Sequence, residues 1–197
     1  MNRRKFIEYS IKTIALASVP IINFFPKVNI SEDEKKLPWS SNTFKFPLEN
    51  FKLQSGETLN NAFLLVNVNG ELNQSKSNAI IFATCFAGSH KFNQMAYGIN
   101  RALNPLKYCI ITPNLFCSGY SSSPSNTSPL QDGPRFPSVT YYDNINAQDK
   151  LISKYFGITN PLMYLGFSMG AQQAFHWGAL HGEKTGGIIP LCGTAKT

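Results

Sequence analysis

The sequence is poor in several features that would define its class. Only 15% of its 197 residues are charged, and it holds no internal repeat. The four cysteines, Cys85, Cys109, Cys117 and Cys192, show neither C-x-x-C pairing nor another spacing typical of zinc ligands. A chain of this length needs no disulfide framework, so we expect buried free thiols, with a Cys109–Cys117 bridge as the alternative in an exported protein. No metal site is predicted.

The net charge of +7 does not indicate a nucleic-acid partner. Residues 1–27 carry +4 of it, from five lysines and arginines against one glutamate, and the remaining +3 is scattered over the chain. Nucleic-acid surfaces gather basic side chains on one face or stripe. We therefore expect neither a nucleic-acid partner nor an acidic substrate.

Long apolar runs are also scarce. The apolar segment 11–25 is interrupted by Lys12 and Pro20, whereas a membrane-spanning helix needs about 20 predominantly apolar residues. No stable membrane span is expected.

The same N-terminal segment has the layout of a targeting signal. Arg3 and Arg4 precede it, as in a bacterial twin-arginine export signal, and Ala15-Leu16-Ala17 offers a candidate cleavage site. We predict that residues 1–25 are signal-like and that residues 26–43 form a polar linker. This indicates an exported or periplasmic protein; a basic amphipathic helix on a cytoplasmic protein is the alternative.

What the sequence does contain is a domain-sized apolar content, with 43% hydrophobic and 13% aromatic residues. From residue 44 onward, strand and helix patterns alternate, which favours an α/β fold with a mostly parallel sheet and helices on both faces. Two strands joined at Ser55-Gly56 suggest an antiparallel hairpin, and a long polar loop covers 113–137. We expect strands over 44–53, 62–68, 78–84, 108–112, 161–167 and from 187, and helices over 92–103, 139–155 and 168–181.

One short motif carries chemistry. Residues 166–170, Gly-Phe-Ser-Met-Gly, fit the G-x-S-x-G pattern between an apolar strand and a helix, which is the context of a nucleophile elbow. A strained turn exposes the Ser168 hydroxyl, and Gly166 and Gly170 let neighbouring backbone approach. Ser168 is therefore the predicted nucleophile. A glycine-rich turn without a nucleophile is the alternative.

Two backbone amides are predicted to stabilise the oxyanion. The N-terminus of the following helix presents unpaired N–H groups, with the Met169 amide as one donor. The second donor is expected from residues 84–90, and we assign it to the Phe86 amide. His90, in the same loop, is expected to cap or pack locally.

Several segments resemble the homoserine O-acetyltransferase-like family of the α/β-hydrolase superfamily. These are residues 166–173 (GFSMGAQQ), 53–59 (LQSGETL), 113–116 (PNLF), 121–126 (SSSPSN), 135–137 (RFP) and 192–196 (CGTAK). The resemblance implies an α/β-hydrolase fold and acyl transfer through Ser168, with Met169 and Phe86 as oxyanion donors. Acetyl-CoA would be a substrate, no cofactor would be bound, and the partners would be a small acyl donor and acceptor.

The sequence departs from that family at two places. Cys117-Ser118 replaces an expected Gly-Asn, and Ala171 stands where the acetyltransferases carry a third glycine. Both departures point to a hydrolase-like branch, so an esterase is the alternative activity.

The other members of a catalytic triad are not evident in the sequence. In this superfamily the acid and the histidine follow the serine. After Ser168 the only acid is Glu183, and His176 and His181 fall on the nucleophile helix, with His176 about 12 Å along its axis. The acids before the serine come in the wrong order and are expected on the surface: Asp132, Asp143 and Asp149.

We therefore expect the N-terminal half of an α/β-hydrolase domain, ending after the strand that follows the nucleophile helix. Whether the chain is an enzyme by itself is left open. Catalysis would need a second polypeptide that supplies the acid, the histidine and the lid. A non-catalytic remnant or binding module is the further alternative.

Overall fold

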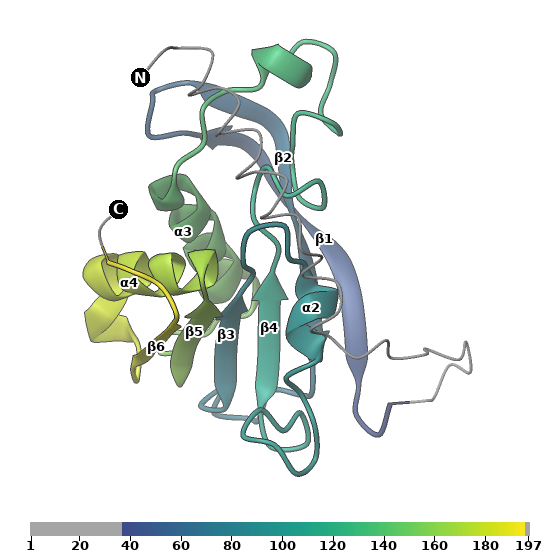
Figure 1. The fold of residues 1–197 in the computed structure, drawn as a ribbon, viewed down its shortest axis with the longest axis vertical. Helices are drawn as coiled ribbons and strands as arrows, with labels where there is room; N and C mark the ends of the chain where they lie inside the picture. Colours follow the sequence, from purple (N-terminus) through teal and green to yellow (C-terminus); the bar gives the residue numbers. More distant parts are fainter. Residues whose placement is uncertain (1–36, 196–197) are drawn as a thin grey trace, which may run out of the picture. The chain divides into compact units, whose positions relative to one another are not determined.

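The computed structural model describes residues 37–195 (Figure 1). Predictions for residues 1–36, including the export signal and most of the linker, lie outside the described residues. Within 37–195, no helix is long and apolar enough to cross a membrane. The strands are β1 (Ser41–Lys52), β2 (Thr58–Asn69), β3 (Ala79–Ala83), β4 (Cys109–Pro113), β5 (Met163–Phe167) and β6 (Ile188–Leu191), and the helices are α2 (His90–Gln94), α3 (Tyr141–Lys150) and α4 (Met169–His181).

The strands form one sheet in the order β1-β2-β4-β3-β5-β6. β3 pairs in parallel with β4 and β5, and β6 adds in parallel to β5. The β1–β2 hairpin joins this parallel part through antiparallel pairing of β2 with β4. The predicted α/β fold with a mostly parallel sheet is confirmed.

The sheet is covered on both faces, as its buried central strands require. In β3, Ile81 and Ala83 point into the larger core, which α3 and α4 complete, while Ile80 and Phe82 point into a smaller cluster on the other face. In Figure 1, α3 and α4 lie on one side of the sheet and α2 lies across the other. Trp177 of α4 is 1% exposed and stacks on Tyr164 of β5 at 4.9 Å between ring centroids.

The predicted hairpin is confirmed, although its first strand is longer than expected. The turn closes through hydrogen bonds from the Leu53 amide to the Glu57 carbonyl and from the Gly56 amide to the Leu53 carbonyl. β1 begins at Ser41, so the end of the predicted linker 26–43 is already strand. The pairing with β2 extends back to Ser41 opposite Asn69, which accounts for the longer strand.

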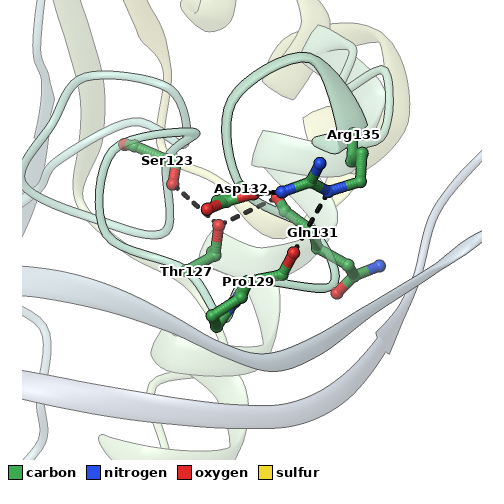
Figure 2. A network of polar contacts seen from close by, with 6 residues as sticks. All are labelled: Ser123, Thr127, Pro129, Gln131, Asp132 and Arg135. Atoms are coloured by element: carbon green, nitrogen blue, oxygen red, sulfur yellow. Dashed lines mark hydrogen bonds and ion pairs between the residues drawn. The ribbon is translucent and has the colours of Figure 1, made fainter.

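The long loop after β4 is ordered by its own polar side chains. Figure 2 shows the Thr127 hydroxyl within hydrogen-bonding reach of the Ser123 and Gln131 carbonyls, at 3.1 and 3.0 Å, and Arg135 paired with Asp132. Gln131 also ties the loop to β2, donating to the Thr58 carbonyl and accepting from the Asn60 amide. These hydrogen bonds order residues 124–135, which contribute no buried apolar side chain.

Buried serines join the first part of this loop to β2. The hydroxyls of Ser121 and Ser122 accept hydrogen bonds from the amides of Leu65 and Phe63, at 3.0 and 2.9 Å. These amides belong to the part of β2 that extends past β4 and has no strand partner on that side. The serine-rich segment therefore satisfies backbone groups that would otherwise lack partners.

The helix predicted over 92–103 is wrong. α2 ends at Gln94, and the chain continues through turns, in which the Gly98 amide donates to the Leu103 carbonyl and the Asn104 side chain accepts from the Leu106 amide. Glycine and asparagine favour such turns because the asparagine side chain competes for backbone groups. The apolar side chains that suggested a helix are partly exposed, with Met95 at 57% and Ile99 at 49%.

The helix predicted over 139–155 is present with altered ends. Thr140 caps α3 through a capping box with Asp143, and Leu151–Tyr155 continues the helix with π-type turns. The prediction that Asp143 lies on the surface is wrong, because it is only 1% exposed. Its carboxylate accepts from the amides of Thr140 and Gln54, at 2.8 and 2.7 Å, and so binds α3 to the hairpin turn.

Candidate active site

Ser168 occupies a strained turn between β5 and α4. Its φ of 55° and ψ of −118° lie in a region that residues with a side chain rarely adopt. The Ser168 amide donates to the Leu191 carbonyl of β6 at 2.8 Å, and its carbonyl accepts from the Ala171 amide at 2.8 Å as α4 begins. The strand, the strained serine and the helix are thus arranged as the G-x-S-x-G pattern predicts.

The two glycines of the motif stand where no side chain fits. A Cβ atom on Gly166 would lie 2.1 Å from the Gly170 carbonyl oxygen, and one on Gly170 would lie 2.9 Å from the Ala83 carbonyl oxygen. These neighbours are backbone atoms, so they cannot turn away as a side chain would. Gly166 closes the turn on itself, and Gly170 lets α4 approach the end of β3.

Ser168 opens onto a cavity of about 390 Å³. Two further cavities, of about 360 and 330 Å³, share Met169 with it and have largely apolar walls that include Leu115 and Phe116. The Ser168 cavity is lined by Phe86, Tyr141, Ser168, Met169, Gln172, Cys192, Gly193 and Thr194. Among the described residues, this lining includes no histidine and no carboxylate.

The loop predicted to supply the second oxyanion donor reaches the same cavity. Phe86, 77% exposed, lines it together with Ser168 and Met169. A tight turn follows Phe86, in which Ala87 has a φ of 53° and the Gly88 amide donates to the Cys85 carbonyl. The structure brings the predicted nucleophile and both predicted donor residues to one cavity, and their catalytic roles stay predictions.

The histidines have structural surroundings. His90 is buried at the start of α2, where its amide and ring meet the Asn114 side chain, and burial lowers the pKa of its imidazole. In α4, His176 Nδ1 lies 3.1 Å from the Gln172 carbonyl, and the His181 ring packs on Trp177 with 4.8 Å between centroids. None of the three lines the Ser168 cavity, as their sequence positions suggested.

The acidic residues have different surroundings. Asp132 pairs with Arg135 on the exposed loop, whereas Asp143 is buried in the cap of α3. The residues that line the Ser168 cavity do not include Asp132, Asp143, Asp149 or Glu183.

Tyr141 and Gln172 belong to the cavity but were not anticipated from the sequence. The Tyr141 hydroxyl donates to the Gln172 side-chain oxygen, and the Tyr141 ring packs against His176. Burial raises the pKa of Tyr141, so the phenol stays protonated at neutral pH. Gln172 follows the motif by two residues and completes the first turn of α4, where its amide donates to the Ser168 carbonyl at 3.3 Å. That spacing was the available signal.

The cysteines do not match the expectation of buried thiols. All four are free, but Cys117 and Cys192 are exposed and only Cys109 is fully buried, where burial raises its pKa to about 12. Cys192 lines the Ser168 cavity, and Cys85 and Cys117 line the neighbouring one.

A sequence model of the alpha/beta hydrolase fold matches residues 78–195, and the chain belongs to that family. Residues 78–195 include β3, both turns at the cavity, the elbow and β6. The fold and the elbow geometry described above agree with this assignment.

Within the family, the chain is similar to esterases and to homoserine O-acetyltransferases. It is 40% identical over 145 residues to an ethyl acetate hydrolase of Pseudomonas veronii, covering 73% of this chain and 42% of the relative. It is 33% identical over 162 residues to a homoserine O-acetyltransferase of Symbiobacterium thermophilum, covering 73% of this chain and 42% of the relative. The predicted resemblance to homoserine O-acetyltransferases is confirmed.

Among solved structures, the chain superposes on an acetylester hydrolase from Corynebacterium glutamicum with a TM-score of 0.76 and 35% identity. The match covers 79% of this chain and 45% of that one. The chain thus spans less than half the length of these relatives.

Proposed function

We propose that the chain carries the nucleophile of a serine esterase that cleaves short-chain esters by acyl transfer to Ser168 and then to water. One observation carries the proposal: Ser168 stands at a strained strand-to-helix turn and shares a cavity with Met169 and Phe86. The names of the similar proteins, an ethyl acetate hydrolase and an acetylester hydrolase, support a small acyl group.

In the proposed reaction, the Ser168 oxygen attacks the ester carbonyl carbon and its proton passes to a base. The carbonyl oxygen becomes an oxyanion held by the Met169 and Phe86 amides, and α4 adds the positive end of its dipole. The intermediate collapses as the base returns the proton to the leaving oxygen, which releases the alcohol and leaves an acyl-serine. Water then attacks the acyl-serine through the same steps and regenerates Ser168. Both half-reactions therefore use the same two amides.

The base is not among the residues that line the cavity in the part of the chain that the structure describes. We infer that it comes, with its acidic partner, from a further segment of the α/β-hydrolase fold, on this or a second polypeptide. The order of the superfamily's triad, in which both groups follow the serine, supports this inference.

Acyl transfer from acetyl-CoA to a hydroxyl acceptor is the second candidate. The similarity to homoserine O-acetyltransferases favours it, and the acceptor would take the place of water in the second half-reaction. Tyr141 and Gln172 give the cavity a polar wall that suits a hydroxyl group. Acetyl-CoA is then a substrate, and no bound cofactor is needed.

A fluorophosphonate probe tests the common first step. Labelling of Ser168, located by mass spectrometry and absent in Ser168→Ala, is the expected result in a sample that circular dichroism shows to be folded. Failure of the folded protein to react would overturn the claim that this chain builds a reactive site and would favour a non-catalytic role. Weak labelling is enough, because hydrolases without their triad partners retain about 10³- to 10⁴-fold acceleration.

Product analysis separates the two candidates. With p-nitrophenyl acetate, or acetyl-CoA, an esterase releases acetate whether or not a hydroxyl acceptor such as homoserine is present. A transferase instead forms the O-acetyl product. Predominant transfer to the acceptor would overturn the esterase assignment.

A further inference from the structure

A buried chain of polar side chains runs from the centre of the sheet to the loop that holds Phe86. The Tyr164 hydroxyl of β5 donates to the Gln148 side-chain oxygen of α3, and Gln148 Nε2 donates to Gln173 Oε1 of α4 at 2.9 Å. Gln173 Nε2 then donates to the Thr84 carbonyl at 2.9 Å. Tyr164, Gln148, Gln173 and Thr84 are each 0% exposed.

The chain has one direction only. Gln148 and Gln173 each accept through oxygen and donate through nitrogen, and the Tyr164 hydroxyl must donate because Gln148 offers it an oxygen. Burial raises the pKa of Tyr164, which keeps this donor protonated. All its hydrogen bonds point toward the Thr84 carbonyl, where β3 has just ended.

The last bond connects the two segments that carry the predicted oxyanion donors. Gln173 lies one turn into α4, whose first residue is Met169, and Thr84 precedes Phe86 by two residues. Gly170 allows this contact, because a Cβ there would lie 2.9 Å from the Ala83 carbonyl oxygen and 3.3 Å from that of Thr84. An apolar side chain at 173 would leave the Thr84 carbonyl without its partner.

Resting on the proposed function, we propose that Gln173 is a positioning residue that sets the spacing of the Phe86 and Met169 amides. Gln148, which donates to Gln173 Oε1, orients the Gln173 amide so that its nitrogen faces Thr84. Oxyanion stabilisation depends on donors fixed within a few tenths of an ångström, and a displacement of about 1 Å costs up to about 100-fold in rate. Gln173 thereby acts on catalysis without touching the substrate.

The test compares two variants of the same buried chain. Gln173→Met removes the bond from Gln148 and the bond to Thr84. Tyr164→Phe removes only the bond to Gln148 and leaves the bond from Gln173 to Thr84 in place. Gln173→Met leaves the Thr84 carbonyl and Gln148 Nε2 without partners, and Tyr164→Phe leaves Gln148 Oε1 without one, so both lower stability, and urea unfolding measures each loss. Only Gln173→Met should change the phosphonylation of Ser168.

We expect Gln173→Met to lower the limiting rate constant of fluorophosphonate labelling about 10- to 100-fold, with little change in the probe concentration that gives half the limiting rate. Tyr164→Phe should stay within about 2-fold of the parent chain. Equal rates in the two folded variants would overturn the proposal.

Hydrogen exchange followed by mass spectrometry keeps the two proposals distinguishable. Gln173→Met should accelerate amide exchange over residues 84–89 relative to Tyr164→Phe, whether or not Ser168 reacts. If Gln173→Met exchanges faster but Ser168 of the parent chain does not react, the proposed function is wrong, while the hydrogen-bonded link between α4 and this loop is supported. If the two variants exchange equally over residues 84–89, Gln173 does not hold this loop and the positioning role is overturned.

Discussion

The two turns at the Ser168 cavity are held in different ways. At the elbow, Ser168 is held mainly by packing within the motif, where Gly166 lies against the Gly170 backbone, with one added hydrogen bond to Leu191 of β6. The turn that carries Phe86 also contains a residue with positive φ, Ala87 at 53°, but it leads into a helix of five residues. Hydrogen bonds from distant segments hold this second turn.

The difference explains why one turn is visible in the sequence and the other is not. Packing that only glycine allows produces a short sequence motif. Support from side chains far away in the sequence produces no local sequence pattern. On either side of the second turn, the Thr84 carbonyl accepts from Gln173 and the His90 amide donates to Asn114, partners 89 and 24 residues away in the sequence, while the nearer Asn93 donates to the Phe82 carbonyl.

Breaking the local packing of the elbow should have the largest effect. Gly166→Ala places a methyl group 2.1 Å from a backbone oxygen, so we expect a loss of about 3 kcal/mol or more in the free energy of unfolding. Gly182→Ala is the matched control, because Gly182 has a helical φ of −57° and no atom within 4 Å of its added Cβ. Urea unfolding of both variants is the measurement.

The control should be neutral or more stable by up to about 1 kcal/mol, because alanine restricts the unfolded chain. Similar unfolding curves for the two variants would mean that the elbow is not closely packed, and the two turns would then not differ in how they are held.

Breaking a distant support of the second turn should cost less. Asn114→Leu leaves the His90 amide and the Leu65 carbonyl without the buried side-chain partners they have at 3.0 and 2.8 Å. We expect a loss of about 2–3 kcal/mol, with faster hydrogen exchange at His90. Asn50→Leu, on the exposed face of β1, should stay within about 0.5 kcal/mol of the parent.

A change confined to Asn50→Leu, with Asn114→Leu unaffected, would contradict the view that distant side chains hold the second turn. Denaturant titration measures the free energy of unfolding, and hydrogen exchange on the same samples measures the protection of the His90 amide.

Acid should weaken the second turn before the elbow. Burial lowers the pKa of His90 below its ordinary 6.5, while the Asn114 side chain raises it less and Lys91 lowers it further. As the pH falls through the pKa of the unfolded state, that state takes up a proton first, so folding stability declines with falling pH. Between about pH 7.5 and about pH 5, the urea midpoint of the parent should fall more than that of His90→Gln.

Parallel pH curves for the parent and His90→Gln would show that the imidazole is not held in its neutral form. Ser168 labelling gives an independent check on the elbow over the same pH range.

The smallest expected effect concerns backbone strain at the two turns. Ala87→Gly relieves a left-handed conformation but frees the unfolded chain, so we expect a gain of at most about 1 kcal/mol. At Ser168, whose ψ of −118° adds strain, Ser168→Gly should exceed Ser168→Ala in stability by about 1–2 kcal/mol. Thermal or urea unfolding of the glycine and alanine variants compares the strain. A reversed order at 168 would contradict the strain assigned there.

Most of the sheet could be predicted from the sequence because each strand satisfies a local rule. β3, β4 and β5 are short apolar runs between turns, and the elbow sits where its motif requires. The prediction of a helix over 92–103 was wrong because Gly98 interrupts the apolar spacing and the Asn104-Pro105 pair follows directly, and these residues favour turns.

The polar interior could not be predicted. Gln148, Gln173 and Asp143 are residue types that usually face solvent on a helix, and only the folded structure supplies the partners that allow their burial. Tyr141 reaches the cavity for a similar reason, since α3 and α4 must first pack together. The wall of the site opposite the motif therefore depends on tertiary contacts.

The hydrogen bond from the Ser168 amide to the Leu191 carbonyl has a consequence for synthesis of the chain. Proteins are made from the N-terminus onward, so the serine turn leaves the ribosome before the strand that supplies its acceptor. During that interval nothing from β6 holds the backbone of Ser168 in its unfavourable conformation. The bond between Ser168 and Leu191 therefore forms only after β6 has been made, and a nascent chain ending before Leu191 lacks this support of the serine turn.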